Sequence, residues 1–288
     1  MTVGVVLGAG GSLGWAFHLG VIDGIRDVTG RALTDVSKVV GTSAGGAIGA
    51  SVLAGADAEE ILGSISAPLT PEQQEEMAAA RSRGGRRRWP LRLLRPQSPK
   101  MLRRGGFVGL VGLAPAGVFP TYPIRRFPTH SLTDWPDQLW IPSVRLGDGA
   151  VVVFGRDRRD VPVPDAVEAT SAVPVLFQPK RIGDRRFIDG AVASATHAHL
   201  LADHGLDLVI VSSPMTRPGR GPVKLRARRQ LKAEVSTLTR NGTRVVVVEP
   251  DEAIMTVADG FPRQNPERGS DIIDAARAMT VEALQQNH

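Results

Sequence analysis

The stretch "VVGTSAGGAIG" at residues 39–49 places a single serine, Ser43, between glycines at the end of an apolar, β-branched run. The run predicts a strand, and the small residues after it predict a helix. Glycines two positions before and after Ser43 fit the G-x-S-x-G nucleophile elbow, a sharp turn that lifts the serine hydroxyl clear of the backbone. Ser43 is therefore a candidate nucleophile. Serine is also a common helix cap, so a purely structural role stays open.

The beginning of the chain has the same strand, loop and helix order. Residues 3–7 form a short β-branched run, the glycine-rich "GAGGSLG" follows at 8–14, and the next apolar residues have helical spacing. Two consecutive βα units favour an α/β fold, in which helices cover a mainly parallel sheet. Functional groups are then expected at the carboxyl ends of the strands.

The composition favours a single large domain that spans residues 1–288, and it limits which kinds of catalytic and metal site are possible. With 288 residues and 42% hydrophobic content, the chain can bury a substantial core. Because it has no cysteine, disulfides, thiolate catalysis and zinc–sulfur sites are excluded, and a cytoplasmic location is favoured. We recognise neither a signal peptide nor a segment long and apolar enough to span a bilayer. The net charge of +6 points to an anionic surface as partner.

Regular patterns return after an irregular, proline-rich and arginine-rich segment at about residues 68–136, which we interpret as an insertion or cap. A hairpin is expected around the turn at residues 147–149, and a short helix is expected to end before Pro174. "RIGDRRFIDGAVAS" predicts a strand that runs into a loop at Asp189. Two further strands are expected in "LDLVIVSS" and "TRVVVVEP", with a basic helix at about 217–240 between them and an amphipathic helix at the end.

The glycine-rich loop at 8–14 can present backbone N–H groups to a ligand. In acyl transfer, such donors stabilise the oxyanion of the tetrahedral intermediate. A dinucleotide site is the alternative, but Leu13 stands where the last glycine of G-x-G-x-x-G is needed. The serine turn on the second strand would also have no role in nucleotide binding.

A serine nucleophile needs a base, and two interpretations remain open. In the first, His197, His199 or His204 follows Asp189 in the order of an α/β-hydrolase triad, although Ser43 follows fewer strands than is usual there. In the second, Asp189 at the end of the "FIDGA" strand is itself the base, because a carboxylate in a partly desolvated cleft has a raised pKa. Asp-Gly is also a common turn. The remaining histidines are His18, His130 and His288.

The ordered motifs "GAGGSLG", "GTSAGG", "ATSAVPVLFQP" and "FIDGA" resemble the bacterial patatin-like phospholipases, from the first strand to about residue 250. The resemblance implies a three-layer α/β/α fold and a catalytic dyad with Ser43 as nucleophile and Asp189 as base. It places the oxyanion hole at the backbone of Gly10, Gly11 and Ser12. It also implies hydrolysis of acyl esters in phospholipids, lysophospholipids or acylglycerols through an acyl-enzyme, without a metal or other cofactor.

Two positions depart from the family pattern. Ala9 replaces the first glycine of the loop and Leu13 replaces its basic residue, so side-chain contact from this loop to a substrate phosphate is in doubt. Ala191 replaces the second glycine after the aspartate, which is a milder change.

The segment Arg81–Arg104 carries ten basic residues and no acidic residue, interleaved with Trp89 and several leucines. Basic charge with apolar anchors is typical of segments that bind anionic membranes, so we expect peripheral binding to the inner face of the membrane. A solvated, disordered loop is the alternative. Nucleic-acid binding is a weaker choice, because only one aromatic residue is available for stacking. A non-enzymatic membrane-binding or nucleic-acid-binding protein built around this segment therefore also remains open.

Overall fold

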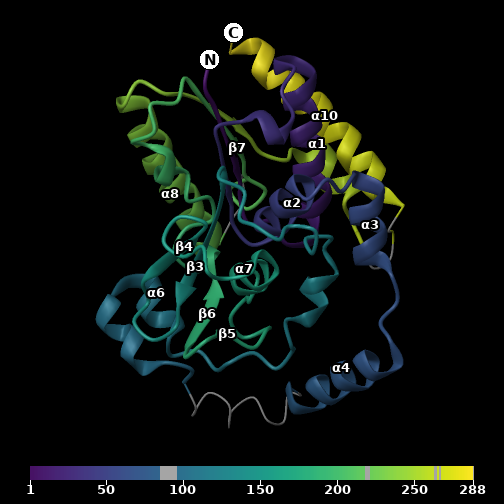
Figure 1. Cartoon of the computed structure of the whole chain (residues 1–288), viewed down its shortest axis with the longest axis vertical. Coiled ribbons are helices and arrows are strands. Elements are labelled where there is room, and N and C mark those ends of the chain that lie inside the picture. Colours follow the sequence, from purple (N-terminus) through teal and green to yellow (C-terminus); the bar gives the residue numbers. More distant parts are fainter. Residues whose placement is uncertain (85–95, 218–220, 263–264, 266, 288) are drawn as a thin grey trace.

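A sheet of eight strands forms the centre of the computed structural model, which describes residues 1–84, 96–217, 221–262, 265 and 267–287 (Figure 1). The strands lie in the order β5-β6-β3-β2-β1-β7-β8, and β4 pairs with β3. Their bounds are β1 (Val3–Leu7), β2 (Lys38–Gly41), β3 (Leu139–Arg145), β4 (Val151–Phe154), β5 (Lys180–Ile182), β6 (Arg185–Asp189), β7 (Leu208–Ser212) and β8 (Arg244–Val248).

The sheet combines a parallel part with an antiparallel edge. Strands β3, β2, β1, β7 and β8 are parallel to their neighbours in this order. Strands β4 and β6 are antiparallel to β3, and β5 is antiparallel to β6. The expected α/β fold with a mainly parallel sheet is therefore confirmed, and the expected hairpin is the β3–β4 pair.

Helices cover both faces of this sheet, which gives the three layers. The helices α1 (Gly11–Thr29), α2 (Ala44–Leu53) and α10 (Arg268–Gln286) pack on one face, in the same apolar cluster as Val5 and Leu7 of β1. On the other face, Val6 packs in a cluster with residues of α8 (Pro222–Arg240) and of the short helix η6 (Ala198–Leu201). In Figure 1, α8 lies to the left of β7 and α1 and α10 lie to its right. The alternation along β1 follows from the two-residue period of a strand.

The irregular segment at about 68–136 contains helices and isolated bridges in its described part. After η1 (Leu33–Asp35) and α3 (Ala58–Ser66), the chain forms α4 (Pro71–Gly84), η3 (Pro99–Arg104), α6 (Gly106–Val111) and η4 (Tyr122–Arg126). The later helices are α7 (Val163–Thr170), η5 (Gly190–Val192) and α9 (Glu252–Val257). The expected short helix before Pro174 is α7, and the expected basic helix is α8.

The single strand expected before Asp189 is wrong. Residues 180–189 instead form the antiparallel hairpin β5–β6, in which Arg181 pairs with Arg186. The chain reverses at Gly183, whose φ of +60° a glycine adopts without strain. The sequence contains the turn signal Gly183-Asp184, but the expectation placed the loop only at the later Asp189-Gly190.

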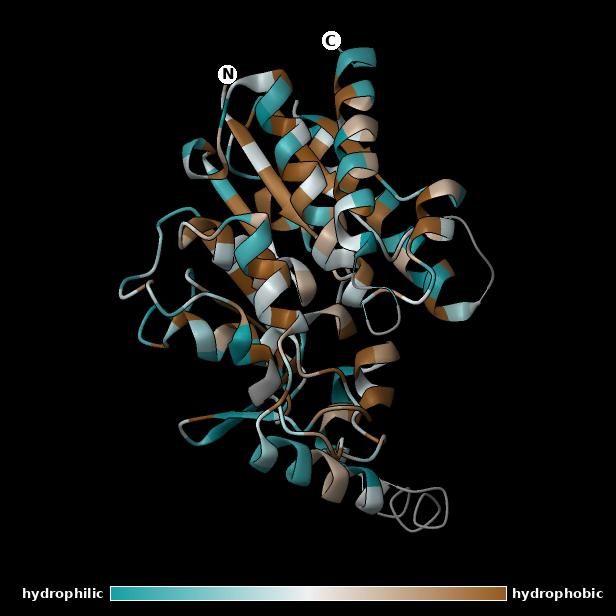
Figure 2. Cartoon of the chain, turned by 90° about the vertical axis from the view of Figure 1, so that its right-hand side faces the viewer, coloured by the Kyte–Doolittle hydropathy of each residue, from teal (hydrophilic) through white to brown (hydrophobic). Residues whose placement is uncertain are grey.

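The packing of α10 on α1 closes the core next to the N-terminal βα unit. Figure 2 shows hydrophilic and hydrophobic bands alternating along α10, whose buried residues include Ile272, Ala276 and Leu284. The two helices approach so closely that a Cβ added at Gly20 would lie 2.2 Å from the backbone oxygen of Ile273. A side chain at position 20 therefore requires α1 and α10 to move apart.

We expect Gly20→Ala to lower the free energy of unfolding by about 1–3 kcal/mol, because overpacking at a backbone contact forces the helices to shift. The matched control is Gly63→Ala on α3, where an added Cβ meets nothing within 4 Å. This control should instead stabilise the protein by about 0.5–1 kcal/mol, since alanine favours a helix over glycine. Urea denaturation of both variants measures the difference, and equal effects would contradict the close approach.

Candidate active site

Ser43 lies in the tight turn between β2 and α2. Its φ of 54° and ψ of −119° belong to a region that residues with side chains rarely adopt. The glycines on either side permit this turn: a Cβ at Gly41 would lie 2.6 Å from the Cα of Gly46, and a Cβ at Gly45 would lie 2.0 Å from the carbonyl oxygen of Leu7. The sharp strand-to-helix turn expected from the sequence is therefore present, and the role of Ser43 as nucleophile stays a prediction.

Thr170, the last residue of α7, holds the backbone of this turn. The N–H of Ser43 donates a hydrogen bond to Thr170 Oγ1 at 3.0 Å, and Thr170 Oγ1 donates to the carbonyl oxygen of Pro142 on β3 at 2.6 Å. Thr170 is fully buried. The sequence analysis did not find this role, because the contact joins residues that are 127 positions apart.

Asp189 ends β6 and faces Ser43. The Ser43 hydroxyl donates to Asp189 Oδ2 at 2.7 Å, and the backbone N–H of Ala191 donates to Oδ1 at 2.8 Å. Both side chains are buried, with 7% of Ser43 and 3% of Asp189 exposed. Burial raises the pKa of Asp189 to about 7, against the opposing effect of its two hydrogen bonds. A carboxyl group with this pKa can exchange protons near neutral pH.

The glycine-rich loop reaches the same place from β1. Gly10 caps α1 and Gly11 begins it, and both line the cavity at Ser43. In the described part of the chain, the N–H groups of Gly10 and Gly11 have no hydrogen-bond acceptor. Free N–H groups and the positive end of a helix favour an anion at this position. Ser12 does not line the cavity, and its part in an oxyanion hole stays a prediction, as does that of the glycines.

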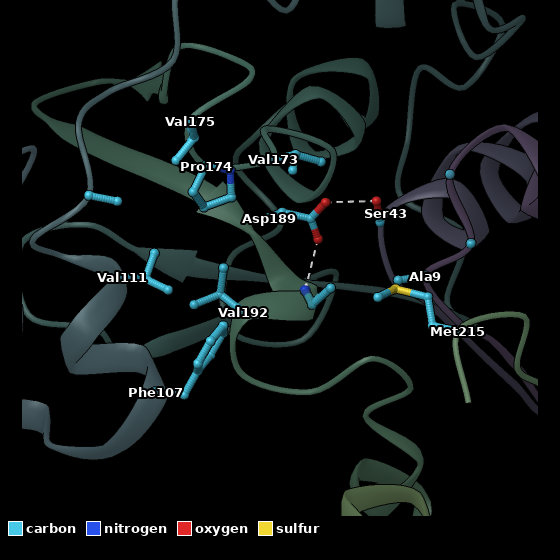
Figure 3. A pocket seen from close by; sticks show the side chains of 14 residues that line it. Ala9, Ser43, Phe107, Val111, Val173, Pro174, Val175, Asp189, Val192 and Met215 are labelled. Carbon is cyan, nitrogen blue, oxygen red and sulfur yellow. Dashed lines mark hydrogen bonds between the residues drawn. The ribbon is translucent and has the colours of Figure 1, made fainter. Parts of the chain in front are cut away.

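An apolar cavity of about 570 Å³ opens above Ser43 and Asp189 (Figure 3). The close-up shows Val173, Pro174 and Val175 on one side of the carboxylate and Val111, Val192 and Phe107 on the other. Its further lining residues are Ala9, Gly10, Gly11, Ala114, Ala191 and Met215. Ser43 and Asp189 are thus the polar side chains of an otherwise apolar cavity.

None of the five described histidines contacts Ser43 or Asp189. His197 Nδ1 lies 3.2 Å from Thr42 Oγ1, His199 Nδ1 lies 2.9 Å from Glu234 Oε1, and His204 stacks edge-on against Trp140. His130 is exposed, and its Nε2 contacts the carbonyl oxygen of Arg125. His288 lies outside the described residues. The described histidines thus offer Ser43 no hydrogen-bonded base.

His18 supports the glycine-rich loop from within α1. Its Nε2 donates to the carbonyl oxygen of Gly8 at 2.7 Å, so its Nδ1 accepts from the Ser212 hydroxyl at 2.7 Å. Burial lowers the pKa of His18 to about 4 and keeps the ring neutral at pH 7. The sequence analysis counted His18 only among the histidines available as a base. Its spacing from the loop, on the first turns of the following helix, was the signal for this supporting role.

The described residues offer no cluster of His, Asp and Glu arranged to hold a metal ion. The chemistry that they do offer is nucleophilic. A serine hydroxyl lies within hydrogen-bond distance of a carboxylate of raised pKa, and free N–H donors line the same cavity. This arrangement suits acyl transfer, in which a base removes the serine proton while an oxyanion forms.

We expect a fluorophosphonate probe to label Ser43 at a rate that rises about tenfold from pH 6 to pH 8. The reason is that Asp189, with a pKa of about 7, accepts the proton only when it is ionised. Stopped-time labelling followed by peptide mapping gives the rate at each pH, and Asp189→Asn should remove the rise. A rate that is constant between pH 6 and pH 8 would contradict the assignment of the base.

Comparison with known proteins identifies two similar solved structures and one matching family. The structures of VipD from Legionella pneumophila and of the type III effector protein ExoU cover 99% of this chain, with TM-scores of 0.46 and 0.44 and identities of 13% and 17%. The chain spans 67% of the first protein and 53% of the second. The pattern of the patatin-like phospholipases matches residues 5–202, which contain the glycine-rich loop, the serine turn and Asp189. This chain therefore belongs to the patatin-like phospholipase family.

Proposed function

We propose that this protein hydrolyses acyl ester bonds of lipids through a dyad of Ser43 and Asp189. The observation that carries the proposal is the 2.7 Å hydrogen bond from Ser43 Oγ to Asp189 Oδ2 at the floor of an apolar cavity. Membership of the patatin-like phospholipase family supports the same reaction class. The substrates are phospholipids, lysophospholipids or acylglycerols.

In the first half-reaction, Ser43 Oγ attacks the carbonyl carbon of the ester while its proton passes to Asp189 Oδ2. The carbonyl electron pair moves onto oxygen, and the N–H groups of Gly10 and Gly11 stabilise the resulting oxyanion. As the intermediate collapses, the bond to the alcohol breaks and Asp189 returns the proton to the leaving oxygen. The products are the free alcohol and an acyl ester on Ser43.

In the second half-reaction, a water molecule takes the position of the alcohol. Asp189 accepts a proton from this water as its oxygen attacks the acyl carbon. The second tetrahedral intermediate releases the fatty acid, and the proton on Asp189 returns to Ser43 Oγ. One carboxylate therefore serves both half-reactions, which requires a pKa close to the working pH.

The cavity supports an acyl chain as the group bound beside the dyad. Its walls are aliphatic and aromatic, and its volume of about 570 Å³ lies within the range of small-molecule pockets. Burying a methylene group there contributes about 0.8 kcal/mol. A cavity with an apolar lining and the dyad at its base favours a substrate with an apolar chain over a small, polar ester.

We expect Ser43→Ala and Asp189→Asn each to lower kcat for a short p-nitrophenyl ester by at least about 10³-fold, because each removes a group that takes part in both half-reactions. His130→Ala and His204→Ala are the controls, since neither histidine contacts the dyad. Circular dichroism shows whether each variant is folded. A folded Ser43→Ala protein with wild-type activity would refute the dyad.

Exposed apolar side chains lie on three segments, two of which contribute to the lining of this cavity, and we call these side chains together the apolar rim. It comprises eight of the nine large apolar side chains that are exposed among the described residues. They come from three segments: Leu102, Phe107, Leu110 and Leu113; Val173 and Leu176; and Val223 and Leu225. Phe107 and Val173 also line the cavity, so the rim is continuous with the proposed acyl site. Exposed apolar surface of this kind is typical of contact with a partner or a membrane.

The charge around the apolar rim supports an anionic lipid surface as that partner. Residues 96–121, 171–183 and 213–233, which contain the rim, include no acidic residue. Basic side chains lie beside it on η3 and on the first turns of α8, including Lys100, Arg103 and Arg228. Within the segment Arg81–Arg104, residues 85–95 lie outside the described residues, and the peripheral binding proposed for it rests on composition. No described helix combines the length and apolar character needed to cross a membrane.

We expect Leu110→Glu to weaken binding to vesicles that contain phosphatidylglycerol by about tenfold or more. It removes an apolar contact from the membrane and adds a charge that the anionic leaflet repels. Gln285→Glu is the control, because it adds the same charge on α10, at the opposite end of the molecule in Figure 1. Vesicle co-sedimentation at two salt concentrations measures both. Equal binding by the two variants would contradict docking through the apolar rim.

A further inference from the structure

A second cavity, of about 500 Å³, lies behind Phe107 and is separate from the apolar cavity at Ser43. Phe107 lines both, and the loop after Asp189 divides them: Ala191 and Val192 face the apolar cavity, whereas Ala193 and Ser194 face the second one. The second cavity is polar. Its other polar lining residues are Arg104, His197, His199, Arg226, Gln230 and Glu234.

Two buried polar atoms at this cavity have no partner. Of the three such side-chain atoms among the described residues, two are His197 Nε2 and Gln230 Oε1, and both residues line the cavity. His197 is only 1% exposed, and its other ring nitrogen contacts Thr42. Buried polar groups in native proteins are almost always hydrogen-bonded. Because both of these residues line the same cavity, we look there for a polar ligand that supplies the missing hydrogen-bond partners.

The cavity also contains cations without a carboxylate partner. Arg226 donates to the carbonyl oxygens of Val192 and Ala193, at 3.2 and 2.9 Å, and its guanidinium lies 4.6 Å from the centre of the Phe107 ring. Burial lowers its pKa, since no anion offsets the loss of solvent. Arg104 is exposed at the entrance, and within the described chain it forms no ion pair.

The acidic residue of the cavity is already satisfied. Glu234 accepts hydrogen bonds from Ser194 Oγ, Thr196 Oγ1 and the N–H of Ala198, and it also contacts His199 Nδ1. Two guanidinium groups therefore remain for an incoming anion. Arginine is suited to phosphate, because its planar group can donate two parallel hydrogen bonds.

We propose that this second cavity binds a phosphate ester that also carries hydroxyl groups. Arg104 and Arg226 bind the phosphate oxygens, and the hydroxyl groups complete the hydrogen bonding of His197 Nε2 and Gln230 Oε1. A glycerophosphate unit has these groups, either free or as the headgroup of a phospholipid. Only the lipid source rests on the proposed function, because there the acyl ester would lie at Ser43 on the other side of Phe107.

Binding is tested first without catalysis, on the full-length Ser43→Ala protein at about 0.15 M salt, where the Debye length is about 8 Å. We expect glycerol 3-phosphate to bind with a Kd of about 1 mM or below, and to shift the imidazole NMR signals of His197 and His199 but not that of exposed His130. Arg104→Gln should raise the Kd about tenfold, as loss of a hydrogen bond to a charged group does. Absence of a shift at His197 and His199 overturns the proposal.

Arg103→Gln is the matched control, because Arg103 is the exposed neighbour of Arg104 and, unlike Arg104, does not line the proposed site. This variant should change the Kd for glycerol 3-phosphate less than twofold. An equal loss of affinity in both variants would mean that general surface charge causes the effect, and it would overturn the site. Glycerol and inorganic phosphate serve as probes of the two halves of the ligand. Each should bind more weakly than glycerol 3-phosphate, and binding of glycerol alone with equal affinity also overturns the site.

The source of the phosphate ester is tested in detergent mixed micelles. If it is the lipid headgroup, Arg104→Gln lowers the ratio of kcat/KM for phosphatidylglycerol to that for diacylglycerol about tenfold, and Arg103→Gln, which affects only docking on the anionic surface, lowers it by a clearly smaller factor. If this ratio is unchanged while glycerol 3-phosphate binding still depends on Arg104, the site takes the free phosphate ester. If neither lipid is hydrolysed, the proposed function fails while the binding result stands by itself.

Discussion

The backbone of Ser43 adopts a conformation that costs roughly 1–3 kcal/mol for a residue with a side chain, so the surrounding structure must hold it. Three contacts from distant parts of the chain do so. Gly45 packs directly on the backbone of Leu7, Thr170 accepts the hydrogen bond of the Ser43 N–H, and Asp189 accepts that of its hydroxyl. The sheet order places β1, β3 and β6 where these contacts are made. The position of the Ser43 hydroxyl thus depends on how these strands are arranged in the sheet.

Burial of Asp189 acts against folding but suits the base that we propose it to be. A carboxylate removed from water is stabilised here by only one backbone N–H and one hydroxyl, so its pKa rises to about 7. The protonated form contributes stability that is complete below the unfolded pKa and is lost as the pH rises towards 7. An ion pair with a lysine or arginine would remove this cost, but it would also lower the pKa and weaken the base. The apolar lining of the cavity preserves the raised pKa.

The local parts of the fold and the site could be predicted from the sequence, and the long-range parts could not. A few neighbouring residues are enough to predict each local feature: the β1–α1 and β2–α2 units, the serine turn and the aspartate at a strand end. The β5–β6 hairpin was missed because its strands are only three and five residues long, and the Gly-Asp turn between them was taken as part of one strand. The role of Thr170 depends on a partner 127 positions away, and no local pattern records such a contact. The contact of His18 with Gly8 is local, whereas its contact with Ser212 joins residues 194 positions apart. The late histidines satisfy the sequence order of a triad, but in the fold His197 contacts Thr42, His199 contacts Glu234 and His204 stacks on Trp140.

Residues 190–194, directly after Asp189, form the wall between the two cavities and contact both of them. The N–H of Ala191 fixes the carboxylate from within the apolar cavity, while Arg226 and Gln230 bind the carbonyl oxygen of Ala193 from the polar one. Because η5 spans only Gly190–Val192, movement at one end of this segment displaces the other. The sequence substitutes Ala191 for a second glycine here, which removes conformational freedom from the segment. The position of Asp189, the proposed base, therefore depends on the polar residues behind the loop as well as on Ser43 in front of it.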